Sequence, residues 1–218
     1  PDAGVTVLTA EDDLVELLVE TGGTHGGSHT VTFGAGPPPA LRRTRLIPAE
    51  ATATVRAGRH AGRPSPGPDR LTVRHAAAPD GTARALLRFA LPPDLPARGV
   101  ERAVLWVFGA IPKDPDSRAA DMLQHPLRAH AAAPGHRAWQ EATVTWHSAP
   151  RPGPPLGEAW ATTYSDWAGL DVTAALGAGR APLTLVLAQD DPGPLTELAG
   201  RTAARPAVRP LLHLVHRL

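Results

Sequence analysis

The sequence contains no cysteine among its 218 residues. This absence excludes a disulfide scaffold, a zinc site built on thiolates and a cysteine nucleophile. No stretch of the sequence approaches the ~18 consecutive apolar residues that a membrane-spanning helix needs. We therefore expect no membrane segment.

The chain also has almost no net charge. Lys and Arg together number 22 and Asp and Glu number 21, which leaves a net charge of +1. Nucleic-acid binding needs a clearly basic surface, so we expect no nucleic-acid partner. Proline and glycine are abundant instead, with 25 and 21 residues. Because they interrupt most helix-length windows, a mainly helical fold is excluded.

Short strand-like runs recur between clusters of Pro, Gly and Asp. The runs span residues 5–8, 14–19, 29–33, 51–55, 71–73, 85–89, 103–108, 127–130, 142–146, 183–187 and 211–215. This pattern is typical of antiparallel sandwiches and barrels, and we predict an all-β sandwich of jelly-roll type. The runs 103–108 and 183–187 are almost wholly apolar, as in central strands. One helical turn is expected at 172–176, capped by Asp171 and Gly177.

The composition divides the chain into three parts. Residues 1–36 hold the first three strand-like runs, residues 37–46 are rich in Pro and Arg and are expected to form a linker, and residues 47–218 hold the other runs. Three strands bury one face at most, so the first part is expected to need a partner sheet. Since the chain starts at Pro1 inside a strand-like pattern, we expect it to be the C-terminal piece of a longer protein.

Six segments of the third part resemble one family, in the family's order. They are residues 51–58, 83–91, 100–108, 139–150, 167–173 and 205–214. The fourth, Trp139-Gln-Glu-Ala-Thr-Val-Thr-Trp146 followed by Pro150, resembles the pattern W-x-E-x-x-V-T-W-x-x-x-P of the DNRLRE domain, or carbohydrate-binding module family 96. The resemblance implies a secreted, non-catalytic β-sandwich attached to a bacterial polysaccharide-active enzyme, with a polysaccharide as its ligand.

The sequence departs from this family at acidic positions. Ala90, Ala51 and the stretch Arg201-Thr202 stand where the family usually carries acidic residues, so a family calcium site is in doubt here. Asp114 and Asp116 with Asp121, and the pair Asp190-Asp191, are weak calcium candidates, because they lack the ligand spacing of known calcium loops. His25 and His29 flank two glycines that disfavour the helix a zinc pair needs. We expect no required cofactor.

A second resemblance concerns residues 1–36. Val5-Thr-Val-Leu8 and the segment 21–33 resemble the end of the C-terminal β-domain of the hyaluronate, chondroitin and xanthan lyase family. This resemblance implies a covalently linked catalytic domain upstream. The catalytic residues of that family lie in its helical domain, so none is assigned in this chain.

Sugar-binding sites need aromatic faces for stacking and polar groups for hydroxyls, and Arg for carboxylates. Trp160, Tyr164 and Trp167 lie in a polar segment and are the candidate stacking residues. Arg56 and Arg59 are the candidate carboxylate partners. The alternatives are a loop pinned over the sandwich by its own aromatics and a solvated basic stretch. The other three tryptophans are expected to pack inside the fold: Trp106, Trp139 and Trp146.

These observations favour a carbohydrate-binding module that targets a secreted polysaccharide-degrading enzyme, a lyase, to a glycan. The resemblance implies an anionic glycan such as alginate or a glycosaminoglycan. Two alternatives stay open. One is a structural or adhesive spacer without glycan affinity. The other is an enzymatic role, either as a small lyase or as the C-terminal fragment of a lyase that carries the parent's activity.

Overall fold

A computed structural model describes residues 4–11, 14–20, 42–95, 100–113, 123–133, 139–176 and 182–217. Its regular elements are strands and short 3₁₀ turns. The strands are β1 (Gly4–Glu11), β2 (Leu14–Glu20), β3 (Arg42–Pro48), β4 (Ala51–Arg56), β5 (Arg70–Val73), β6 (Ala83–Phe89), β7 (Val100–Ala110), β8 (Gln124–Ala132), β9 (Pro152–Thr162), β10 (Asp166–Asp171), β11 (Leu183–Ala188), β12 (Thr196–Ala199) and β13 (Leu211–Arg217). The turns are η1 (Gly58–His60), η3 (Thr173–Ala175) and η4 (Pro206–Val208). The predicted all-β sandwich is confirmed.

The first two strands form a separate antiparallel hairpin, β1–β2. They coincide with the expected runs 5–8 and 14–19, and the expected run 29–33 lies outside the described residues. Among the described residues, no helix has the length and hydropathy that a membrane span requires.

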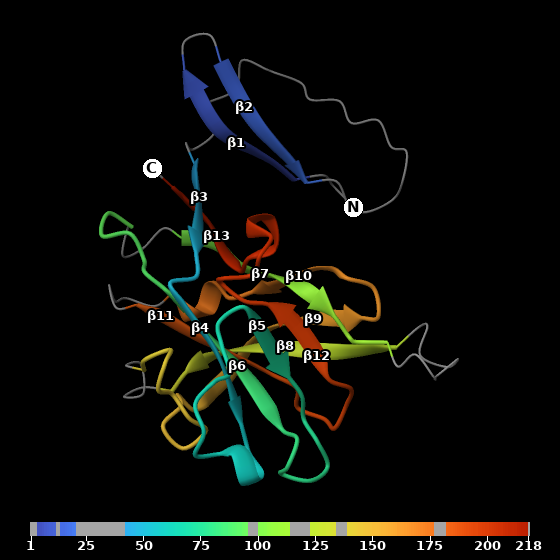
Figure 1. The fold of residues 1–218 in the computed structure, drawn as a ribbon. Helices are drawn as coiled ribbons and strands as arrows, with labels where there is room; N and C mark the ends of the chain where they lie inside the picture. Colours follow the sequence, from blue (N-terminus) through green and yellow to red (C-terminus); the bar gives the residue numbers. More distant parts are fainter. Residues whose placement is uncertain are drawn as a thin grey trace.

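Strand β7 organises a six-stranded antiparallel sheet (Figure 1). One edge of β7 pairs with β10, and the other edge pairs first with β13 and then with β12. Leu211 of β13 lies opposite Trp106, whereas Leu198 of β12 lies opposite Gly109. Beyond these strands, β3 pairs with β13 and β5 pairs with β12.

The second layer is a five-stranded antiparallel sheet with the order β4-β6-β11-β8-β9. Strand β9 forms its edge, and the turn at 163–165 leads from β9 into β10 of the other sheet. This turn therefore connects the two layers at one side of the sandwich.

The core lies between the inner faces of the two sheets. Ala103, Leu105 and Val107 of β7 are buried there against residues such as Leu185 and Leu187 of β11. Because side chains alternate along a strand, Val104, Trp106 and Phe108 face the outside of the six-stranded sheet. Trp106 is half-buried on that outer face, so the expectation that it belongs to the core was wrong.

Residues 142–146 form turns rather than the expected strand. The backbone N–H groups of Thr143 and Val144 both donate to the carbonyl of Gln140, at 3.1 and 2.9 Å. The reason is burial: Trp139 and Val144 cover the outer face of the five-stranded sheet instead of pairing with a strand. We call residues 139–149 the cover. The apolar side chains beneath it belong to Ala51, Ala53, Val55, Leu86 and Val186.

Polar contacts hold the cover in place. Glu141 accepts hydrogen bonds from the backbone N–H of Thr52 at 2.7 Å and from Nε of Arg201 at 2.6 Å. Burial alone would raise the pKa of Glu141, but these hydrogen bonds hold that pKa below its ordinary value. The guanidinium of Arg84 lies 4.5 Å above the ring of Trp146. The expected packing role of the cover's two tryptophans agrees with these contacts.

Two further segments can be compared with the expectations from the sequence. Strand β3 begins at Arg42, inside the range 37–46 that the sequence assigns to a linker. Its basic side chains reach acids on neighbouring segments, with Arg42 paired to Glu101 and Arg45 to Asp94, so the charge run belongs to a strand edge. The second segment is the turn η3, which matches the expected helical turn. Asp171 Oδ1 accepts a hydrogen bond from the backbone N–H of Thr173 at 2.8 Å. Gly177 lies outside the described residues.

Candidate functional site

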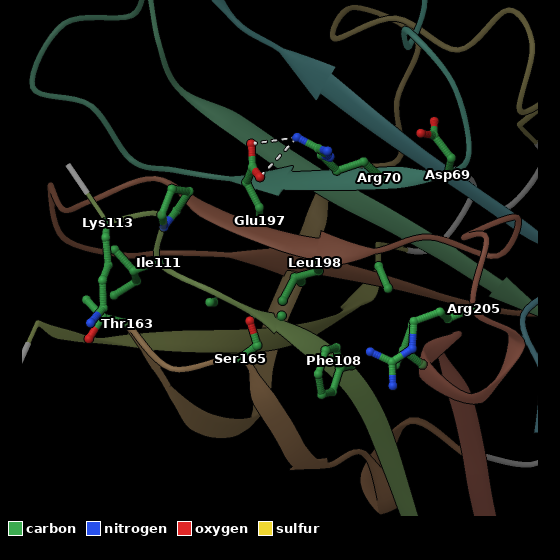
Figure 2. A pocket seen from close by; sticks show the side chains of 15 residues that line it. Asp69, Arg70, Phe108, Ile111, Lys113, Thr163, Ser165, Glu197, Leu198 and Arg205 are labelled. Atoms are coloured by element: carbon green, nitrogen blue, oxygen red, sulfur yellow. Dashed lines mark hydrogen bonds and ion pairs between the residues drawn. The ribbon is translucent and has the colours of Figure 1, made fainter. Parts of the chain in front are cut away.

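A groove lies on the outer face of the six-stranded sheet, and its cavity volume is about 470 Å³. It is lined by Asp69, Arg70, Phe108, Gly109, Ala110, Ile111, Pro112, Lys113, Thr163, Ser165, Glu197, Leu198, Ala199, Arg205 and Val208. Figure 2 shows Lys113 and Arg205 at opposite ends, with Phe108 beside Arg205. The groove therefore combines an apolar floor with cationic ends.

The aromatic part of the floor follows from strand alternation. Phe108 faces outward because its neighbour Val107 is buried in the core. On the paired strand β10, Trp167 lies opposite Phe108, and the two rings meet edge to face with centroids 5.5 Å apart. Gly169 leaves the space that the ring of Trp106 fills, since a Cβ there would lie 2.9 Å from that ring. An aromatic strip thus borders the groove.

The cations that line the groove differ in how far nearby groups compensate their charge. Arg70 is paired with Glu197, with 3.2 Å between Nη1 and Oε2, so its charge is largely compensated. The Lys113 ammonium lies 5.0 Å from the ring centre of Tyr164. Arg205 is exposed and makes no ion pair within the part of the chain that the structure describes. An anionic ligand would find its strongest uncompensated partner at the Arg205 end.

The structure separates the three aromatics that the sequence grouped together. Trp167 packs on Phe108 of the groove, and Tyr164 is 59% exposed between the lining residues Thr163 and Ser165. Trp160 is 56% exposed on β9, next to the inward-facing Ala159, and therefore faces outward from the other sheet. The segment is two edge strands and a turn, not the loop considered as an alternative.

The two arginines chosen from the sequence lie elsewhere. Arg56 ends β4 and Arg59 lies in η1; both are exposed and neither lines the groove. The backbone N–H of Arg59 donates to Asp80 Oδ1 at 2.7 Å, which fixes η1. Their role in binding stays a prediction.

The metal candidates gain no support from the described residues. Asp114, Asp116 and Asp121 lie outside those residues, as do His25 and His29. Asp190 pairs with Arg128. Among the residues that the structure describes, no cluster of three or more His, Asp or Glu side chains could hold a metal ion.

Sequence reasoning missed Phe108, Lys113 and Arg205 as site residues. The run 103–108 looked buried on both faces because nearly all its residues are apolar. The signal that distinguishes its faces is size: Ala103, Leu105 and Val107 point one way, while the larger aromatics point the other. Lys113 and Arg205 line the same groove only because β7 pairs with β12, and no local pattern reveals that pairing.

Comparisons with known proteins agree with this all-β module. The model of carbohydrate-binding module family 96 matches residues 43–204. The matched range includes all of the groove's lining residues except Arg205 and Val208. The chain matches none of the curated proteins with which it was compared.

Proposed function

The chain belongs to carbohydrate-binding module family 96, and we propose that its groove binds an anionic polysaccharide. The observation that carries this assignment is Phe108 in the lining of the groove, with Trp167 packed against it and with Arg205 and Lys113 at the two ends. Apolar C–H patches of a pyranose stack on aromatic rings, and a guanidinium fork matches a carboxylate in two contacts. The site thus has partners for both parts of a uronic acid.

The ligand class we propose is a uronic-acid polysaccharide, such as alginate or a glycosaminoglycan. Such a polymer repeats its carboxylates along the chain, and the groove offers cations at both ends. The hydroxyls of Thr163 and Ser165 and the ion pair of Arg70 with Glu197 offer donors and acceptors for sugar hydroxyls.

We further propose that this non-catalytic module serves a secreted polysaccharide-degrading enzyme, a lyase, to which it is covalently linked. The resemblance of residues 1–36 to a lyase β-domain supports this partner. A tethered module keeps an enzyme near a large substrate by raising its effective concentration, even when the single contact is weak.

The test is affinity electrophoresis of the 218-residue chain in gels that contain alginate, chondroitin sulfate or a neutral glucan. We expect retardation in the anionic gels, and a double variant Lys113→Ala/Arg205→Ala that binds about tenfold more weakly. Exposed ion pairs contribute about 0.2–1 kcal/mol each, and a loss of ~1.4 kcal/mol from the two together is a tenfold loss of affinity.

The matched control is Arg43→Ala/Arg63→Ala, which removes two exposed positive charges that lie outside the lining of the groove. Its retardation should stay within about twofold of the unmodified chain, since long-range attraction between exposed charges is screened by salt. Equal losses in both variants would mean that only net charge matters. No retardation of the unmodified chain in any gel would leave the spacer alternative, and release of unsaturated products absorbing in the ultraviolet would support the enzymatic one.

A further inference from the structure

A second cavity lies on the opposite layer, at the outer face of the five-stranded sheet, with a volume of about 260 Å³. Its charged and titratable lining residues are Arg74, His75, Arg84, His130 and Asp190. The cavity borders the cover, since Arg84 also lies over Trp146. It is separate from the groove, with which it shares no lining residue.

The charge of this cavity is positive, because its one carboxylate is already engaged. Asp190 pairs with Arg128, which lies outside the lining, and its Oδ1 is 3.8 Å from Nε2 of His130. His130 is 7% exposed, and its Nδ1 donates to the Gly153 carbonyl at 2.9 Å, which fixes the ring. The Nδ1 of His75 likewise donates to the backbone carbonyl of Asp190, at 2.6 Å. Asp190 is thus held within a network that leaves the two arginines uncompensated.

The two lining arginines lack acidic partners within the described ranges. Arg74 is exposed, and no carboxylate of a described residue pairs with it. Arg84 is half-buried, and its burial lowers the pKa of the guanidinium without an acid to offset the shift. A half-buried cation that has an aromatic ring but no carboxylate beside it is stabilised when an anion binds.

An exposed tryptophan stands farther along the same face. Trp160 of β9 lies opposite Pro126 of β8, four residues before His130. At ~3.3 Å per residue, that separation is roughly 13 Å along β8. Between them, Arg128 binds Glu158 of β9 at 2.7 Å. A polysaccharide lying along β8 and β9 could therefore reach the ring of Trp160 and the cavity at once.

We propose that this outer face is a second binding site for a uronic-acid segment, with Trp160 as the stacking platform and Arg74 and Arg84 as carboxylate partners. The proposal rests on the proposed function for its ligand class, but not on the groove. Two sites on opposite layers make the module bivalent, so that one molecule holds two stretches of polysaccharide.

The stoichiometry of oligosaccharide binding tests this proposal. The 218-residue chain is titrated with an alginate hexasaccharide, which carries only carboxylates, and with a chondroitin sulfate hexasaccharide, which also carries sulfate esters. We expect two equivalents of either to bind, and one equivalent to Trp160→Ala/Arg74→Ala. Both side chains are exposed, so this variant is expected to fold normally. The groove variant Lys113→Ala/Arg205→Ala is expected to bind one equivalent, at the second site.

The outcomes separate the two sites. If the unmodified chain binds one equivalent and Trp160→Ala/Arg74→Ala also binds one, the second site is overturned and the groove stands. If the unmodified chain binds one equivalent, Trp160→Ala/Arg74→Ala binds none and the groove variant still binds one, the second site is supported and the groove is overturned. A second equivalent seen with chondroitin sulfate alone overturns the assignment to carboxylates. No binding of either oligosaccharide overturns both sites.

Discussion

Replacing Trp139 by alanine should lower the free energy of unfolding by about 3–5 kcal/mol, the range for a buried tryptophan reduced to alanine. Trp139 is 5% exposed and packs on the apolar side chains beneath the cover. Its indole Nε1 donates to Thr184 Oγ1 at 3.4 Å, and Arg88 lies 5.1 Å above its ring. The substitution therefore removes the main apolar contact between the cover and the sheet.

Urea denaturation followed by circular dichroism measures this loss. Trp160→Ala is the matched control, because it removes the same side chain from an exposed site and should change stability by no more than about 0.5 kcal/mol. If Trp139→Ala cost no more than its control, the cover would not be anchored by this ring.

The second large effect is expected at Gly109, where β7 and β12 approach closely. A Cβ at this position would lie 2.1 Å from the carbonyl oxygen of Glu197 and 2.8 Å from Cα of Leu198. Both are backbone atoms, so Gly109→Ala must displace β12 from β7. We expect a destabilisation of about 1–3 kcal/mol. Because Glu197 and Leu198 line the groove, we also expect polysaccharide affinity to fall by about tenfold, or ~1.4 kcal/mol.

Gly62→Ala is the control, since nothing lies within 4 Å of a Cβ at that position. Its unfolding free energy should stay within about 0.5 kcal/mol of the unmodified chain, and its retardation in an alginate gel should be unchanged. Equal stability and equal retardation of the Gly109→Ala and Gly62→Ala chains would show that β12 does not define the groove.

Much of the fold was predictable because short apolar runs between turn residues are typical of β-strands and of few other structures. The runs at 103–108 and 183–187 are indeed central strands, and β11 is buried on both faces. On one side it meets the core, and on the other Val186 lies beneath the cover. The apolar character of the run 183–187 reports this double burial directly.

The failures have physical causes that act over long distances in the sequence. The alternating residues 142–146 belong to a segment that buries its apolar side chains against the outer face of the five-stranded sheet. Local patterning cannot distinguish this burial from strand pairing. Strand β9 begins with Pro152-Gly-Pro-Pro155, a turn signal by composition. It is compatible with a strand because β9 is a sheet edge and its pairing with β8 is irregular near His130.

The candidate site was only partly predictable for the same reason. The sequence identifies Tyr164 and Trp167, which lie beside the groove, but it cannot tell that Trp160 faces away from them. That difference depends on which sheet each strand joins. The cationic ends of the groove, Lys113 and Arg205, are 92 positions apart in the sequence and come to line one groove only in the folded protein.

The most direct test of groove binding is to map backbone amide shifts of the ¹⁵N-labelled 218-residue chain as alginate hexasaccharide is added. The account predicts saturable shifts at residues 108–113, 163–165 and 197–199, whatever happens on the opposite layer. Binding that leaves all three of these segments unshifted, or no saturable shift anywhere in the spectrum, would contradict it.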